Sequence, residues 1–527
     1  MDESLYSHIK ERINKLLKTQ QAHSLCGGLK GLEKESLRVN PEGKIAQTPH
    51  PFSLGAALTN PYITTDYSEA LMEFITPPLS DVKECISFME ALHTYTYQHL
   101  GDELLWGTSM PCVVDGEKSI PIANYGQSNV GQMKHVYRVG LWHRYGRSMQ
   151  AIAGIHFNYS LPETFWPIYQ QIEDNTQPTQ DFISGRYLDM TRNLHRYGWL
   201  VLYLFGASPA ICKSFLKDQD HSFEEFDYGT LFEPNSTSLR MSDIGYKNDS
   251  QSNIDVSYNN LEDYVKNLSA ATHTSYSEYE KIGLKDSHNN HKQLNTNILQ
   301  IENEYYSNVR PKQIAKSSER PSNALKERGV RYVELRSVDL GAFDPSGTSE
   351  QQLYFLEAFM IFCLLTDSPD LSSHEKECVD NNLTQVASQG RAKDLTLHRC
   401  NDSIKLKDWG LEICNEMEAL CHILDADDPT KPYSSSLKYQ VNKFNDASLT
   451  PSARLLNMMK DESLPFFKFA LKKSQEHQTY YSQQQLSAEQ QRFFDKAAEQ
   501  SHKDQQQIES ADTLSFDDYL KEYFSSE

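Results

Sequence analysis

Gly31-Leu-Glu-Lys-Glu-Ser-Leu-Arg-Val39 is the stretch around which the rest of the sequence is organised. Side chains of an extended segment alternate between two faces, so Glu33 and Glu35 project from the same side of a strand. The turn signal Asn40-Pro41-Glu42-Gly43 follows directly. Adjacent carboxylates repel each other unless a cation lies between them, and Mg²⁺ takes oxygen ligands and bridges carboxylates to substrate phosphates. The alternative is a solvated face of an edge strand.

A second group of acids lies between Thr64 and Phe74 and contains Asp66, Glu69 and Glu73. If this segment is helical, Glu69 and Glu73 share a face, where like charges repel. If its end is extended, Glu73 lies in a strand that runs into Pro77-Pro78. In both cases the acids need neutralisation, unless they form a surface cluster.

Three later stretches alternate as strands do. In residues 154–162, His156, Asn158 and Ser160 share one face, and a sheet with one polar and one apolar face suits a cavity wall. In residues 331–339, Glu334 and Arg336 share a face, which suits a metal beside a transferring phosphate or, alternatively, an ion pair on a solvated sheet. We also predict a strand over residues 297–306, with one face formed by Gln300, Glu302, Glu304 and Tyr306.

A basic and aromatic stretch covers residues 134–146 of an otherwise acidic chain. Cationic groups close to carboxylates suit a site for anionic substrates, and the alternative is a helix with a polar face. Helices are predicted over residues 3–20, 81–100, 186–206, 261–284, 350–366 and 405–425. We divide the chain into a catalytic domain, residues 1–465, and a polar helical C-terminal region, residues 466–527.

Composition narrows the function classes. The 527 residues carry 51 basic and 72 acidic side chains, and the net charge of −21 argues against general nucleic-acid binding. No apolar run approaches the length needed to cross a bilayer, and the start lacks a signal peptide. The nine cysteines form no Cys-x-x-Cys pair. We therefore expect a reduced, cytoplasmic enzyme, and no phosphate-binding glycine loop is present.

Several long sequence segments, in the same order along the chain, closely resemble those of the glutamate–cysteine ligases of gamma-proteobacteria. The segments are Gly31–Asn40, Ile63–Pro77, Gly154–Ser160, Tyr203–Cys212, Thr237–Tyr246, Leu299–Glu304 and Tyr332–Ser337. The likeness runs from about residue 27 to residue 370 and thins after residue 375.

The resemblance implies an α+β fold, a cup-shaped antiparallel sheet with helices outside, similar to glutamine synthetase. It implies an ATP-dependent reaction of L-glutamate and L-cysteine to γ-glutamylcysteine through an acyl phosphate, with Mg²⁺ or Mn²⁺, and inhibition by glutathione. A carboxylate is a poor acylating agent because oxide is a poor leaving group. Phosphorylation of the carboxylate provides a better leaving group, phosphate. Clustered divalent metals would neutralise the oxygens involved.

The resemblance also implies roles for individual residues. The implied metal ligands are Glu33, Glu35, Glu73 and Glu334. Arg336 is implied to stabilise the transferring phosphoryl group, with His156 close to the metal and phosphate. Asp66 is assigned to the glutamate amino group and Arg240 to the cysteine carboxylate. The implied pocket for the cysteine side chain is formed by Tyr67, Tyr137, Leu141, Tyr246 and Tyr306.

The sequence departs from the family pattern at Tyr67, where phenylalanine is expected, and the added hydroxyl bears on the preference among cysteine-like acceptors. Three functions therefore stand: the glutamate–cysteine ligase, a ligase that joins glutamate to another amine, and a non-catalytic relative that senses an amino acid or nucleotide. The presence of every expected acid argues against the last.

Overall fold

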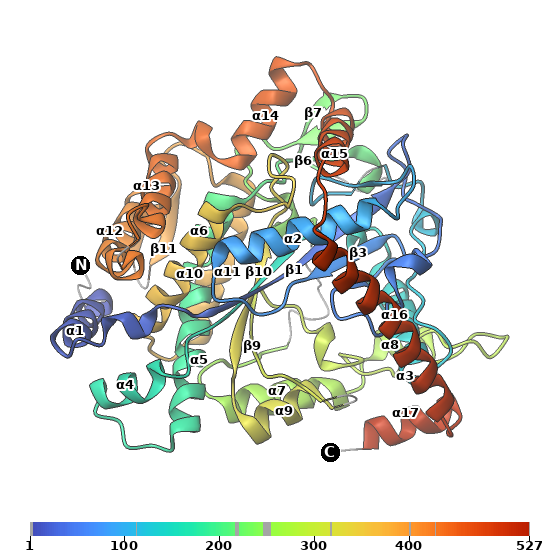
Figure 1. Ribbon diagram of the computed structural model, residues 1–527, viewed down its shortest axis with the longest axis horizontal. Coiled ribbons are helices and arrows are strands. Elements are labelled where there is room, and N and C mark those ends of the chain that lie inside the picture. Colours follow the sequence, from blue (N-terminus) through green and yellow to red (C-terminus); the bar gives the residue numbers. More distant parts are fainter. Residues whose placement is uncertain are drawn as a thin grey trace.

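The computed structural model describes residues 4–111, 113–216, 221–245, 254–316, 319–399, 402–426 and 428–525. Tyr246 lies outside these residues. The described chain is an α+β structure built on one antiparallel sheet with helices packed around it, which confirms the predicted fold class (Figure 1).

The sheet brings together strands that are far apart in the sequence. Its order is β2 (Ile63–Thr65), β3 (Leu71–Ile75), β1 (Leu29–Val39), β5 (Ile155–Ser160), β10 (Tyr332–Val338) and β9 (Val309–Lys312), and β4 (Leu104–Leu105) also pairs with β1. The strands predicted around Glu33, His156 and Glu334 are thus confirmed. For the segment that ends at Phe74, a helix and an extended conformation were both considered, and its end is extended.

The register of the sheet decides which polar groups meet. Glu33 on β1 lies opposite His156 on β5, and Glu35 lies opposite Glu73 on β3. Since residues directly opposite have their Cβ atoms about 5 Å apart, this register places acids from neighbouring strands on one face. The apolar residues of β5, among them Phe157, are buried.

Helices cover the apolar side of the sheet and hold the main core. Elements that contact the strands include α2 (Val82–Tyr97), α5 (Thr179–Tyr197) and α6 (Trp199–Phe205), and α10 (Glu350–Leu365) packs on α2 and α5. Residues 186–206 thus form two helices that meet at Gly198 rather than one. The helices predicted at 3–20, 350–366 and 405–425 are confirmed as α1 (Ser4–Lys18), α10 and α12 (Leu406–Asp425).

The prediction of a strand over residues 297–306 is wrong. This segment is irregular and contains a single 3₁₀ turn, Glu302–Glu304. Its side chains bond to backbone groups that a ladder would use: Glu304 Oε2 accepts from the Gln300 amide at 2.6 Å, and Gln300 Oε1 accepts from the Leu294 amide at 2.9 Å. Such local bonds compete with strand pairing.

The helix predicted over residues 261–284 is also two helices, α7 (Leu261–His273) and α8 (Ser277–Ile282), separated where Ser275 pairs with Asn297. Residues 134–145 of the basic and aromatic stretch lie in one helix, α3 (Asn129–Tyr145), and Gly146 follows its end. The remaining elements are α4 (Phe165–Ile172), β6 (Ala210–Cys212), β7 (Glu224–Asp227), β8 (Thr230–Phe232), α9 (Pro321–Arg328), α11 (Ser373–Gln389), β11 (Thr396–Arg399), β12 (Asp402–Lys405), α13 (Pro432–Asn445) and α14 (Pro451–Asp461).

The C-terminal region is helical and packs on the rest of the chain. It consists of α15 (Phe466–Ser482), α16 (Ala488–Ala511) and α17 (Phe516–Ser525). The first two contact α2, and α17 contacts α3 (Figure 1). The boundary at residue 465 remains a prediction.

The cysteines that the structure describes, Cys26, Cys85, Cys212, Cys363, Cys378, Cys414 and Cys421, are all free. Among the described helices, none has the length and apolar character needed to cross a membrane.

Candidate active site

Two adjoining cavities lie on the polar side of the sheet. The larger, of about 380 Å³, is lined by acids from three strands: Glu33, Glu73 and Glu334. The smaller, of about 140 Å³, is lined by Glu35, Tyr67 and Arg240 among others. Both share the residues Asp66, Tyr137, Arg138, His156, Asn303, Arg310 and Arg336. They therefore form two lobes of one site.

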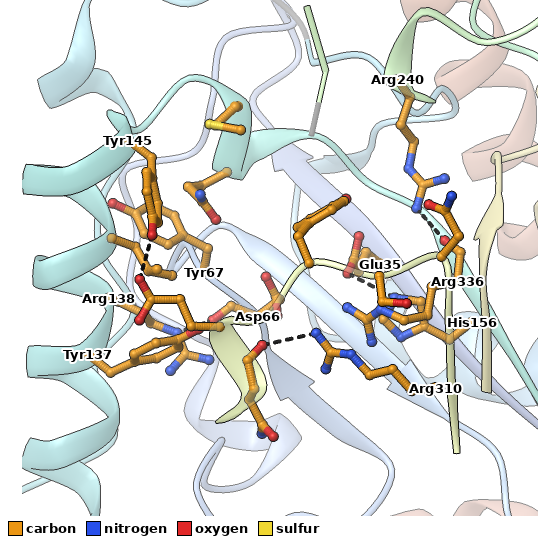
Figure 2. A pocket seen from close by; sticks show the side chains of 18 of the residues that line it. Glu35, Asp66, Tyr67, Tyr137, Arg138, Tyr145, His156, Arg240, Arg310 and Arg336 are labelled. Atoms are coloured by element: carbon orange, nitrogen blue, oxygen red, sulfur yellow. Dashed lines mark hydrogen bonds and ion pairs between the residues drawn. The ribbon is translucent and has the colours of Figure 1, made fainter. Parts of the chain in front are cut away.

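The structure places every described site residue of the prediction in this pair of lobes. Beyond those just named, Leu141 and Tyr306 line the smaller lobe. Tyr246 is the one predicted site residue that lies outside the described residues. Figure 2 shows Tyr67, Tyr137 and Arg138 on one side of the smaller lobe and Glu35, His156 and Arg336 on the other, with Asp66 between them.

A group suited to a divalent cation lies in the larger lobe. Ligand atoms of Glu33, Glu73 and His156 all lie within 4.8 Å of one another. The His156 Nδ1 lies 3.0 Å from Glu33 Oε2, and Asn158 Nδ2 donates to Glu33 Oε1 at 2.9 Å. Carboxylate oxygens with an imidazole nitrogen are donors that Mg²⁺ or Mn²⁺ accepts.

Two of the predicted metal ligands have carboxyl groups with raised pKa values, Glu73 in the larger lobe and Glu35 in the smaller. Burial and the neighbouring Asp66 carboxylate raise the pKa of Glu35 to about 8. Burial and the carboxylate of Glu33 raise the pKa of Glu73 well above its usual range. A divalent cation among these groups would let them ionise, because a nearby opposite charge favours the charged form. The residues present therefore fit a metal.

Glu334 is the acid that the protein does neutralise. Its carboxylate is 1% exposed and lies 3.2 Å from Lys312 Nζ, and Arg336 Nη1 donates to it at 2.9 Å. Burial alone would raise the pKa of Glu334, but Lys312 and Arg336 hold it well below its usual range. Glu334 is therefore a carboxylate at every pH near neutrality.

His156 stands at the centre of the acids as a neutral ring. Burial and the neighbouring Arg336 guanidinium lower the pKa of His156. Its Nε2 lies 4.0 Å from Glu35 Oε1, and its Nδ1 lies 4.0 Å from Glu334 Oε1. A neutral imidazole can ligate a metal or donate one hydrogen bond.

The smaller lobe combines aromatic walls with a guanidinium. The Tyr67 side chain is buried, and its hydroxyl makes no hydrogen bond within the described part of the chain. Arg240 Nη2 donates to the Arg336 carbonyl at 2.8 Å, and Arg240 Nη1 lies 3.5 Å from Asp339 Oδ1. Gly154 permits this position, since a Cβ there would lie 2.1 Å from Arg240 Nη2.

Several cations of the site were not singled out from the sequence. Arg310 and Lys312 come from β9 and face the larger lobe, and the intervening Pro311 obscured the alternation of that strand. Lys134 and Arg138 lie one helical turn apart on α3. Their i, i+4 spacing within the basic and aromatic stretch was the signal that could have identified them. Burial and Arg138 lower the pKa of Lys134 to about 8.

Comparisons with known proteins agree with this geometry. A family model described as glutamate-cysteine ligase matches residues 13–386. A relative named glutamate–cysteine ligase from Alcanivorax borkumensis is 47% identical over 523 residues, which cover 98% of this chain and 99% of the relative. One with the same name from Pseudomonas putida KT2440 is 47% identical over 499 residues, 94% of this chain and 95% of the relative.

Solved structures show the same similarity. A glutamate–cysteine ligase from Francisella tularensis in complex with AMP superimposes with a TM-score of 0.90 at 36% identity, covering 95% of this chain and 98% of that one. A bifunctional glutathione synthetase from Pasteurella multocida gives a TM-score of 0.71 at 25% identity, covering 91% of this chain and 55% of that one. This chain belongs to the glutamate–cysteine ligase family.

Proposed function

We propose that this site joins the γ-carboxylate of L-glutamate to the amine of L-cysteine, using ATP, to give γ-glutamylcysteine, ADP and phosphate, the first step of glutathione synthesis. The observation that carries the proposal is the convergence of Glu33, Glu73 and Glu334 from separate strands beside Arg336 and Lys312. The acids can bind a metal ion, and the neighbouring Arg and Lys side chains can bind phosphate oxygens. Together these groups suit the transfer of a phosphoryl group. The named activity of the relatives and the AMP held by the similar structure support it.

Glu33, Glu35, Glu73 and Glu334 would hold Mg²⁺ or Mn²⁺, with His156 beside them. When bound, the metal would neutralise charge on the phosphate oxygens. Arg336, whose guanidinium lies next to Glu334, would stabilise the transferring phosphoryl group.

In the first step a γ-carboxylate oxygen of glutamate attacks the γ-phosphorus of ATP. The bond from that phosphorus to ADP breaks, and γ-glutamyl phosphate forms. In the second step the cysteine amine attacks the acyl carbon, phosphate leaves with the bonding electrons, and the amine gives up its proton. Walls that exclude water protect the acyl phosphate from hydrolysis between the two steps.

The smaller lobe would orient the two amino acids. Asp66, which lies between the lobes, would accept the glutamate ammonium, and Arg240 would bind the cysteine carboxylate. The cysteine side chain would contact the pocket of Tyr67, Tyr137, Leu141, Tyr246 and Tyr306. Glutathione contains the γ-glutamylcysteine unit of the product, so it would compete for the same lobe.

Measurement of ADP release, with the amide product identified by mass spectrometry, tests the proposal. We expect ADP and γ-glutamylcysteine in equal amounts only when glutamate, cysteine, ATP and Mg²⁺ are all present. Turnover with 2-aminobutyrate or another amine, but none with cysteine, would establish a ligase with a different acceptor. No ADP under any combination would leave a binding protein and overturn the proposal.

A further inference from the structure

The last helix of the chain contributes to the wall of the larger lobe. Tyr519 and Tyr523 lie one turn apart on α17 and line the cavity that also contains Glu33, Glu73 and Glu334. Both tyrosine side chains are half-buried. A helix from the end of the chain thus lies at the edge of a cavity built mainly by the central sheet.

The wall around these tyrosines differs in chemistry from the rest of the lobe. Val130 and Met133 of α3, with Ile301, are the other apolar residues that line it. The remaining lining residues are mostly charged, with the acids accompanied by cations such as Lys134, Arg310 and Lys312. One cavity therefore offers an aromatic and apolar surface at one part and a charged surface at another. A ligand with a flat heteroaromatic ring and a polyanionic chain matches both surfaces.

Side-chain contacts hold α17 at this position. Leu520 is buried in a small cluster with Met133, Val136 and Leu294, which is separate from the main core. Asp517 accepts from Lys285 Nζ at 2.8 Å and lies 2.9 Å from His291 Nε2. These contacts fix the helix so that Tyr519 and Tyr523 face the cavity.

The geometry points to α17 as the base-binding wall of the ATP subsite, with the rings of Tyr519 and Tyr523 packing against the purine. This inference rests on the proposed function, since it presumes that the triphosphate lies at the acids and cations. The two tyrosines act as positioning and specificity residues, and the charged residues hold the phosphates.

The experiment uses the full chain with Tyr519→Ala, Tyr523→Ala and the double substitution. The matched control is Phe524→Ala, which removes an aromatic ring that packs in the same small cluster but does not line the cavity. The probes are Mg²⁺–ADP and Mg²⁺–tripolyphosphate, because the latter carries the charge of the nucleotide without a base. Their dissociation constants are measured by calorimetry, together with the KM values for ATP, glutamate and cysteine.

We expect the double variant to bind ADP about tenfold more weakly and to show a similarly raised KM for ATP, as expected for a lost stacking surface. The affinity of the double variant for tripolyphosphate and its KM values for both amino acids stay unchanged. A second double variant, Tyr519→Phe with Tyr523→Phe, binds ADP as the unmodified chain does. Equal weakening of ADP and tripolyphosphate, unchanged ADP binding, or the same effect in Phe524→Ala would overturn the inference.

These outcomes separate the inference from the proposed function. If the unmodified chain releases no ADP with glutamate and cysteine, the proposed function fails. If it does so and the double variant binds ADP normally, only the role of α17 fails.

Discussion

Glu334→Gln removes the negative charge that two cations share while keeping the size of the side chain. The Glu334 side chain is 1% exposed, whereas those of Lys312 and Arg336 are 27% and 23% exposed. Removing one partner of a buried ion pair costs about 3–5 kcal/mol. Because water reaches both cations, we expect a smaller loss, about 2–3 kcal/mol in the free energy of unfolding. Turnover should fall by about 100-fold or more, since the phosphate site loses a fixed charge.

The pH dependence of the stability loss follows from the depressed pKa of Glu334. A carboxylate whose folded pKa lies below its ordinary value of 4.5 stabilises the fold above that pH, and loses the contribution as pH falls through the folded pKa. The stability gap between the unmodified chain and Glu334→Gln should therefore be constant from pH 6 to 8 and close only below about pH 4.5.

Urea unfolding of the metal-free chains followed by tryptophan fluorescence measures this gap, and ADP release measures turnover. The matched control is Glu412→Gln, which breaks a more exposed pair with Arg399 and should cost less than about 1 kcal/mol with normal turnover. If Glu334→Gln unfolds at the same urea concentration as the control and turns over within tenfold of the unmodified chain, the assignment of Glu334 is refuted.

Three further substitutions and one titration test the rest of the site. Arg336→Lys should lower kcat about 100-fold with little change in the KM for ATP, and a normal kcat in the ADP assay would remove Arg336 from the transition state. Because the pKa of Glu35 is raised to about 8, its carboxyl group is mostly neutral below that pH and gains its charge as the pH rises. Calorimetry should therefore show Mg²⁺ affinity rising from pH 6 to 8. An equal rise in Glu35→Gln would refute the dependence of Mg²⁺ binding on the ionisation of Glu35. Gly154→Ala should displace Arg240 and raise the KM for cysteine more than it lowers kcat; unchanged cysteine kinetics would tell against this contact. Tyr67→Phe should fold normally and shift the preference between cysteine and 2-aminobutyrate several-fold, and an unaltered ratio of kcat/KM would show that the hydroxyl does not face the acceptor.

Local patterns were enough to predict most of the elements that carry the site. The period of two predicted the strands around Glu33, His156 and Glu334. It placed Glu33 and Glu35 on one side of the first strand, and a polar face opposite an apolar one in the other two. Residues 297–306 show the same period, yet side chains such as Glu304 bond to nearby backbone amides and bend the chain instead. Alternation alone cannot distinguish a strand from a loop whose polar side chains bond locally, because it does not show which backbone groups those side chains will bond.

The sequence by itself determined the family, the strands that bear the acids and the residue types that a metal and phosphate site requires. Only the tertiary structure decided that Glu35 and Glu73 face each other across β1 and β3, that Lys312 and Arg336 neutralise Glu334, and that α17 reaches the same cavity. The reason is that strand register and helix docking depend on contacts between residues far apart in the chain. Burial and neighbouring charge then set the protonation of each acid, and neither exists until those contacts form.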